Sequence, residues 1–473
     1  MTVEAIIISD IHVGAGELDD FDSELEDQFV KFFDRRCASA DAIELVINGD
    51  FLDFVQAEPW RDKNLRADSS AMDDGGRIPL CFTESQSVQK LNRILAAHPR
   101  VFDSLSAFLE ARLDNRLIIN PGNHDADFFW PKVRRTLVDA LAKDGSRFDE
   151  RIEFNLSQVY RPRSAPFVWI EHGHQYDTCN SFFIGREPRW DVEAPPILDD
   201  AAGVPRLIEC VGTRFLNLCL NYLDKDYPFV DNVKPFSRFV NLFLASAVVP
   251  NYGPVRAAVA VFHILAFLSK TLKRVPSDIL GVDDPRAESP REILLAFIER
   301  LSPTKRNALR LELIERGCPL SSSLELALAS DRTAGAVMDG LARNIDLLDV
   351  FEADRDGTLG ASSGTLHLTR AFNLDETKAL EKKADAICVA HEADCVVMGH
   401  THEVVNGGTA ARYFNPGSWT RNLEFTRERN PRSWTLLKRE SQAAFPFELN
   451  YVSIRPDRNP SVLLETHARS RNG

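Results

Sequence analysis

Five short pieces of the sequence gather the side chains that bind divalent metal ions. They are "SDIH" at 9–12, "GDFLD" at 49–53, "GNHD" at 122–125, "EHGH" at 171–174 and "GHTH" at 399–402. Of the eleven histidines in the chain, these pieces contain His12, His124, His172, His174, His400 and His402. Histidines that only pack in a core would be scattered, so this concentration indicates one common site.

The side-chain types in these pieces favour a pair of transition-metal ions. Imidazole, carboxylate and amide oxygen together suit Mn, Fe, Zn or Co better than Mg or Ca, which prefer shells of oxygen. Four His, two Asp and one Asn are too many ligands for one ion but enough for two. Two divalent ions about 3.5–4 Å apart lower the pKa of a shared water, generate hydroxide and stabilise an in-line displacement at phosphorus.

Each piece follows a short apolar run that is typical of a buried β-strand. The runs are rich in Ile and Val, as in "VEAIIIS" at 3–9 and "IELVIN" at 43–48. Helical patterns at 24–37 and 88–98 lie between the early runs, and this alternation predicts an α/β fold. Ligands of such folds bind beyond the carboxyl ends of the strands, which is where the polar pieces stand.

The strand pattern stops near residue 181 and returns near residue 385. Amphipathic helical patterns fill the interval, which we interpret as a helical cap inserted into the α/β domain. The end of the chain is polar and is expected to fray. The predicted divisions are 1–180 and 385–455 for the two parts of the α/β domain, 181–384 for the cap and 456–473 for a tail.

One segment of the predicted cap, residues 236–274, is strongly apolar. Pro250 and Pro254 interrupt it, so neither half reaches the roughly 18 apolar residues that span a bilayer. Between 205 and 275 the chain has nine Lys or Arg and four Asp or Glu, an excess of positive charge. Two interpretations stay open: a helix pair buried in the cap, or an interfacial helix that contacts a lipid-like anion.

Composition limits the classes of partner. The 473 residues carry a formal net charge of -14, which argues against a nucleic-acid scaffold because such proteins present basic surfaces. The eight cysteines include no CxxC pair, and the first ten residues lack the basic and long apolar regions of an export signal. The sequence predicts a cytoplasmic protein with reduced thiols and leaves open a peripheral membrane contact through 236–274.

The ordered set of pieces resembles the calcineurin-like metallophosphoesterase superfamily over roughly 1–180 and 385–455. The resemblance implies a four-layer α/β/β/α sandwich with two packed mixed sheets, here with a large helical cap insertion. It also implies a hydrolase that needs two divalent ions, with Mn expected first and Fe or Zn as alternatives.

The same resemblance assigns roles to the matching residues. Asp50 would bridge the two ions, and His124 would be the catalytic histidine, which either protonates the leaving oxygen or stabilises the charge of the transition state. Asp125 would orient His124. The ligands of one ion would be Asp10, His12 and His402, and those of the other would be Asn123, His172 and His400.

Several neighbouring residues have two open interpretations. Asp53 would either support the site or cap a helix, and the sequence favours the structural role. His174, Tyr176 and Asp177 would either line the mouth of the substrate site or hold His172 in place. His174 is the residue that we name as a candidate for substrate binding.

The substrate class is less well defined than the chemistry. "SDIHVG", "GDFLDF" and "GNHD", with an insertion after "HGH", look similar to the UDP-2,3-diacylglucosamine hydrolase branch, which cleaves a lipid-linked pyrophosphate. The insertion is longer than the usual cap of that branch, and His124 stands where the branch usually has Arg. We therefore expect a phosphodiester or pyrophosphate, either a small molecule or a lipid-like anion, without naming the compound.

Two alternatives belong to other functional classes. A nuclease-type phosphodiesterase shares the D-x-H, "GNHD" and late G-H-x-H motifs. A DNA or RNA substrate calls for many Lys and Arg contacts, and the net charge of this chain argues against them. A non-catalytic scaffold on the same fold would have lost metal ligands, whereas this chain keeps all seven. The sequence does not predict an oligomeric state.

Overall fold

The computed structural model describes residues 3–57, 71–142, 148–182, 195–234, 303–326, 376–424 and 442–470, with short gaps at 17, 19, 77, 149, 178–179, 218–220, 225–227, 230–231, 316–319, 321–322, 325, 409–411 and 443. The chain divides into two compact units. The first comprises 1–232, 375–423 and 435–473, and contains every candidate site residue. The second comprises 233–374 and 424–434. Most of the predicted cap, including 236–274, lies outside the described residues.

Six strands of the first unit form a mixed sheet in the order β14-β13-β1-β2-β3-β4. β1, β2, β3 and β4 are parallel, whereas β13 runs antiparallel to both β1 and β14. Parallel pairing brings the carboxyl ends of β1, β2 and β3 to one edge. The bounds are β1 Val3–Ile8, β2 Ala42–Asn48, β3 Arg116–Asn120, β4 Ile152–Phe154, β13 Glu448–Ile454 and β14 Val462–Arg469.

A second mixed sheet has four strands in the order β10-β11-β9-β5. β5 and β11 run parallel to the central β9, and β10 is antiparallel to β11. The predicted class, an α/β protein, is therefore confirmed at the level of two mixed sheets with flanking helices. The bounds are β5 Val168–Ile170, β9 Cys395–Val397, β10 Val404–Gly407 and β11 Tyr413–Pro416.

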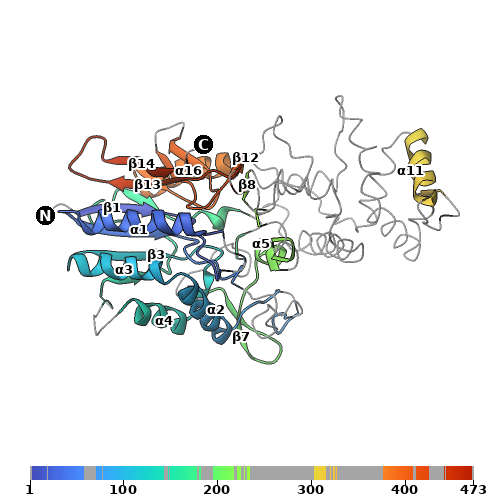
Figure 1. Cartoon of the computed structure of the whole chain (residues 1–473), viewed down its shortest axis with the longest axis horizontal. Helices are drawn as coiled ribbons and strands as arrows, with labels where there is room; N and C mark the ends of the chain where they lie inside the picture. The colour runs from blue at the N-terminus through green and yellow to red at the C-terminus, as the bar shows by residue number, and fades with distance from the viewer. Residues whose placement is uncertain are drawn as a thin grey trace. The chain divides into compact units, whose positions relative to one another are not determined.

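Four amphipathic helices accompany the six-stranded sheet, and Figure 1 shows α1 and α3 running alongside its strands. Asp22 caps α1 by accepting the N–H groups of Glu24 and Leu25, and Thr83 and Gln86 form a capping box on α2. The two helices predicted from sequence at 24–37 and 88–98 are confirmed as α1 and α2. The bounds are α1 Ser23–Cys37, α2 Glu84–Ala97, α3 Pro99–Ala111 and α4 Pro131–Leu141.

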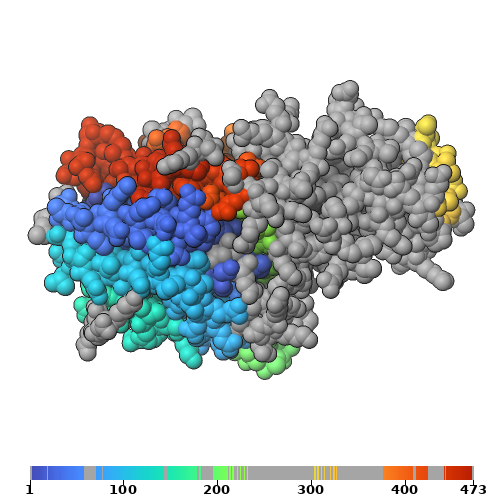
Figure 2. Space-filling model, in the orientation of Figure 1, coloured from blue at the N-terminus to red at the C-terminus, as the bar shows by residue number. Residues whose placement is uncertain are grey.

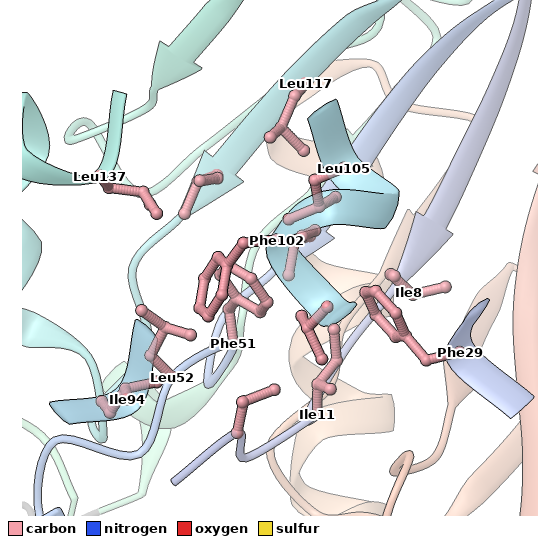
Figure 3. Close-up of a cluster of buried hydrophobic side chains, with 14 of the residues drawn as sticks. Ile8, Ile11, Phe29, Phe51, Leu52, Ile94, Phe102, Leu105, Leu117 and Leu137 are labelled. Carbon is pink, nitrogen blue, oxygen red and sulfur yellow. The ribbon is translucent and has the colours of Figure 1, made fainter. Parts of the chain in front are cut away.

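Alternate residues of the strands enter two different cores. Ile6 and Ile8 of β1 belong to a large cluster with the helices, whose centre is drawn in Figure 3. Ala5 and Ile7 belong to a second cluster that contains residues of both sheets, among them Val168 of β5. The outer helix α16 (Glu376–His391) packs its own apolar residues against β9 and β11. Strand alternation explains why β1 is buried on both faces.

The end of the chain differs from the sequence-based expectation. Residues 456–473 were expected to fray, but β14 pairs with β13 along its length. Two side chains of β14 contact other elements. Glu465 accepts a hydrogen bond from Tyr451 of β13 at 2.6 Å, and His467 Nε2 lies 3.0 Å from the Gln28 carbonyl of α1. Figure 2 shows the surfaces of α1 in blue and β13 and β14 in red side by side. The segment "VLLETHAR" is a half-exposed edge strand with several polar residues.

The beginning of the predicted cap also differs from expectation. Where helical patterns were expected to begin, β6 and β7 form an antiparallel pair. Among the residues that the structure describes, none belongs to a helix long and apolar enough to cross a bilayer. The remaining elements are η1 Ala126–Phe129, η3 His174–Tyr176, β6 Ile197–Asp199, β7 Pro205–Leu207, α5 Val211–Phe215, α6 Asn221–Asp224, β8 Val233–Lys234, α11 Pro303–Glu315 and β12 Leu423–Glu424.

Candidate metal centre

The loops that carry the candidate ligands begin where strands end. Apolar neighbours anchor these loops: Ile11, Phe51 and Leu52 are fully buried and lie in the cluster of Figure 3. The N–H groups of Ile11 and His12 both donate to the Asp50 carbonyl at 2.9 Å, which ties the loop after β1 to the loop after β2. Asp10 and His12 follow β1, Asp50 follows β2, Asn123 and His124 follow β3, His172 follows β5, and His400 and His402 follow β9.

The backbone is strained at the candidate ligands. Seven non-glycine residues of the described chain have a positive φ, and five of them are candidate ligands. Each such conformation costs on the order of 1–3 kcal/mol and persists only where the surrounding structure holds it, as happens at functional sites. The five are Asp10 at 53°, His12 at 54°, Asp50 at 49°, His400 at 70° and His402 at 56°.

Two glycines let these loops approach one another. A Cβ on Gly122 would lie 2.1 Å from Asp50 Oδ1, and a Cβ on Gly399 would lie 1.9 Å from Ser9 Oγ. No real Cβ tolerates such contacts, so any side chain at either position would displace the carboxylate of Asp50 or the loop that carries Asp10. These glycines were quoted in the sequence motifs, and close approach is the physical reason for them.

Three overlapping groups of side chains could each hold a metal ion. Within each group the ligand atoms all lie within 4.8 Å of one another, and most of the residues are buried. His12 and Asp50 each belong to two of the groups, so the three groups overlap. The groups are Asp10 with His12 and His402, His12 with Asp50 and His124, and Asp50 with His172 and His400.

The first group shows ring nitrogens that face one another. His12 Nε2 lies 3.1 Å from His402 Nε2, and His402 Nε2 lies 3.3 Å from Asp10 Oδ1. His12 Nδ1 lies 3.1 Å from Asp53 Oδ2, so the ring proton is held there and the Nε2 lone pair is directed at His402. Two ring nitrogens and a carboxylate oxygen at these distances could share a proton or a metal ion.

The group of Asp50, His172 and His400 is also oriented by hydrogen bonds. His172 Nδ1 donates to the Asn48 carbonyl at 2.8 Å, which turns Nε2 toward Asp50 Oδ2 at 3.1 Å. The His400 N–H donates to both carboxylate oxygens of Asp10 at 3.0 Å, and its ring Nε2 lies 3.0 Å from Asp177 Oδ2. Asp177 therefore contacts His400, whereas the sequence offered it either the mouth of the substrate site or a contact with His172.

Asn123 offers an independent indication that a cation fits. Its side chain is 5% exposed, and its Oδ1 has no hydrogen-bond partner. An unsatisfied buried acceptor costs about 1–3 kcal/mol, so its retention calls for an explanation. The next N–H along the chain, that of His124, donates to Asp50 Oδ1 at 2.9 Å, which fixes the Asn123 loop beside the candidate bridging residue. A divalent ion would satisfy the amide oxygen.

The partner of His124 is a different residue from the one predicted. Asp125 was expected to orient His124, but its two oxygens accept the N–H groups of Gly122 and Phe51, at 2.5 and 2.8 Å. His124 Nδ1 instead lies 2.8 Å from Asp53 Oδ2, the oxygen that also faces His12. Asp53 Oδ1 accepts the Gln56 N–H at 2.7 Å, so the turn-capping role is present as well.

Replacing Asp53 by Asn should slow turnover and narrow its pH range. Burial lowers the pKa of His124, but Asp53 and Asp50 outweigh it and raise the pKa to about 10. Without the Asp53 charge that pKa falls, so a step that needs protonated His124 should fail at a lower pH than in the wild type. A pH–rate profile for both proteins measures this. An alkaline limb at the same pH in both would show that Asp53 does not control His124.

His174 is buried beside the ligands, with 1% of its surface exposed. Its ring centroid lies 5.3 Å from that of His172. Burial, reinforced by His172 and His400, holds the pKa of His174 well below its usual value, so the ring is neutral. Its role in substrate binding stays a prediction, and its ring lies beside those of His172, His400 and Phe182.

Metal binding should strengthen as the pH rises. Burial lowers the pKa of His172, but Asp50 and Asp10 outweigh it and raise the pKa to about 9 in the protein without ions. An ion needs the Nε2 lone pair and must displace that proton, so apparent affinity for Mn²⁺ should rise by about tenfold per pH unit for each proton released and level off above pH 9. Titrations with Mn²⁺ between pH 6 and 9 test this, and a constant affinity over that range would contradict it.

Comparison of the chain with protein-family models, with curated proteins and with solved structures gave no match. The description of the site therefore depends on its own residues. What they establish is a buried cluster of His and Asp side chains that lie close together and could hold metal ions.

Proposed function

We propose that the chain is a dinuclear metal-dependent phosphoesterase of the calcineurin-like type. The observation that carries the proposal is the position of Asp50, which is shared by two ligand groups built from the ends of strands in both sheets. Cores on both faces of the six-stranded sheet, and α16 on the four-stranded one, support a four-layer α/β/β/α arrangement.

The donor set fits two ions of the Mn, Fe or Zn type, with Mn first. Asp10, His12 and His402 would hold one, and Asn123, His172 and His400 would hold the other, with Asp50 between them. When bound, two divalent ions supply positive charge that acidifies water and stabilises the negative charge of a phosphoryl group. No step beyond that is assigned to them.

The chain's own residues position and move a proton. Asp53 fixes Nδ1 of His124, so Nε2 is the nitrogen left to meet a substrate, and 16% of the His124 side chain is exposed. A protonated Nε2 would donate to the oxygen that leaves phosphorus. Asp50 and Asp53 are both buried, which strengthens their attraction for the imidazolium and keeps it charged near neutral pH.

The proposed substrate is a phosphodiester or pyrophosphate, either small or lipid-like. The apolar, basic segment that suggested a lipid-like anion and a peripheral membrane contact, 236–274, lies outside the described residues. The substrate class is therefore to be decided by experiment.

A hydrolysis panel tests the proposal. Purified protein with Mn²⁺ is given an aryl phosphomonoester, an aryl phosphodiester, single-stranded DNA and a nucleotide-diphospho-lipid, each alongside the Asp50→Asn variant. Hydrolysis of the diester or of the lipid pyrophosphate by the wild type alone supports the proposal. A strong preference for DNA, with steep salt dependence, would favour a nuclease instead. Equal rates in wild type and variant would contradict the proposal, because Asp50 would then have no part in the reaction.

A further inference from the structure

Three buried asparagines join side chain to side chain behind the candidate metal centre. Asn155 Nδ2 donates to Asn120 Oδ1, and Asn120 Nδ2 donates to Asn48 Oδ1, both at 2.9 Å. Asn48 Nδ2 donates to the Glu171 carbonyl at 2.9 Å, and Ser157 Oγ donates to Asn155 Oδ1 at 2.7 Å. Every amide points the same way, and each is oriented by the next.

The chain of amides crosses from one sheet to the other. Asn48 is the last residue of β2, and Asn120 is the last residue of β3. The two asparagines face each other in the register of this strand pair, and Asn155 follows β4. Glu171 follows β5 of the four-stranded sheet. The three asparagines are 0%, 1% and 9% exposed, in a setting where hydrogen bonds are stronger than in water and polarise one another. The ladder therefore fixes the strand ends that surround the site.

Asn48 holds His172 at two points. Its main-chain carbonyl accepts His172 Nδ1 at 2.8 Å, which fixes the ring, and its side chain binds the carbonyl of Glu171, which fixes the backbone just before the ring. The same main-chain carbonyl accepts from Ser9 Oγ at 2.7 Å, and Ser9 Oγ lies 2.5 Å from Asp10 Oδ2. Asn48 thus connects to one candidate ligand on each side of the site.

We propose that Asn48 is a positioning residue that directs His172 at the second metal ion, and that Asn120, Asn155 and Ser157 hold Asn48 in place through the amide ladder. The inference rests on the proposed dinuclear site. A residue that orients a metal-binding histidine contributes about 10–100-fold in metal affinity. The link from Asn48 to Asp10 of the first site runs through the Asn48 main-chain carbonyl and Ser9 Oγ, which a side-chain substitution leaves in place, so the effect should be selective for the second site.

The test is a Mn²⁺ titration, with free Mn²⁺ followed by its paramagnetic resonance signal, on wild type and on Asn48→Leu, Asn120→Leu and Asn115→Leu. Asn115 is a matched control: it is 0% exposed, donates to the Phe108 carbonyl at 2.8 Å and accepts the Ile43 N–H at 3.0 Å, yet it precedes β3 at the end opposite the site. Melting temperatures are measured on the same samples.

Asn48→Leu keeps the main-chain carbonyl that accepts His172 Nδ1 and loses the side-chain bond to the Glu171 carbonyl. It should bind one Mn²⁺ as the wild type does and the other about 10-fold more weakly, at the lower end of the range for an orienting residue. Asn120→Leu should weaken the same site to a smaller extent, because Asn48 keeps both of its bonds to the His172 segment. Asn115→Leu should lower the melting temperature and leave both sites intact. Two normal sites in Asn48→Leu, or equal weakening in Asn115→Leu, would overturn the inference.

Two further outcomes also decide the inference. If Asn48→Leu does not fold, Asn120→Leu decides, and two unchanged sites in that folded variant would overturn the ladder. A wild type that binds fewer than two Mn²⁺ would overturn the proposed function together with this inference. The two failures can be told apart. If the wild type binds two Mn²⁺ and the variants bind them equally well, only the positioning role of Asn48 and the amide ladder is overturned.

Discussion

Asp50→Asn should lose nearly all hydrolytic activity and at least one of the two metal ions. The carboxylate lies 3.1 Å from His172 Nε2 and 3.9 Å from His12 Nε2, and an amide there can offer only one oxygen to a cation. Burial disfavours the charge of Asp50, but His172 and His124 outweigh it and hold its pKa well below the usual range, so the negative charge is present throughout the neutral range. Loss of a ligand should weaken metal binding by more than the roughly 10–100-fold of an orienting residue.

Metal analysis and rate measurements on one preparation check this prediction. Asp73→Asn is the control: Asp73 is also buried, at 5% exposure, but its Oδ1 accepts the Ile78 N–H in a turn outside the site. That variant should keep both its ions and its activity. An active Asp50→Asn with a full metal complement would remove Asp50 from the centre and, with it, the dinuclear interpretation.

His124→Ala should keep its metal ions and lose about 10²–10⁴-fold in turnover, the usual contribution of a general acid. Asp53 would remain to orient His12, so the first metal group stays intact. The loss should depend on the leaving group. An aryl oxide leaves without a proton, whereas an alkoxide needs one, so an alkyl ester should suffer more than an activated aryl ester.

Two substrates that differ only in the leaving group measure this dependence. His391→Ala is the control, because His391 is exposed and stacks on Trp169, with ring centroids 4.3 Å apart and no contact with the candidate ligands among the described residues. Equal losses for both esters in His124→Ala would assign His124 to charge stabilisation. Unchanged turnover would exclude it from the mechanism.

The candidate ligands could be recognised in the sequence because they directly follow the predicted strands. Asp10 and Asp50 follow apolar runs that are typical of buried strands. The gathering of six histidines in the motifs indicated that the strand ends share one site. Asp53 was harder to assign because a carboxylate three residues before a backbone N–H also caps turns, and in the structure it does both. Asp125 was misplaced because adjacency in sequence suggested contact with His124, whereas its side chain turns back to Gly122 and Phe51.

Other features left no usable signal in the sequence. A single asparagine at a strand end is typical of a turn, so Asn48, Asn120 and Asn155 gave no sign that they meet across three strands. β14 was missed because an edge strand exposes one face and its polar residues resemble those of a free tail. Positive φ at five ligands depends on the close approach of whole loops, which local sequence does not specify.

The most direct measurement is the number of Mn²⁺ ions that the purified wild-type chain binds near neutral pH, counted by titration beside Asp50→Asn. We expect two ions per wild-type chain, with the variant retaining one at most. A wild type that binds none, or a variant that binds two, would contradict the claim that Asp50 joins two metal sites at the ends of these strands.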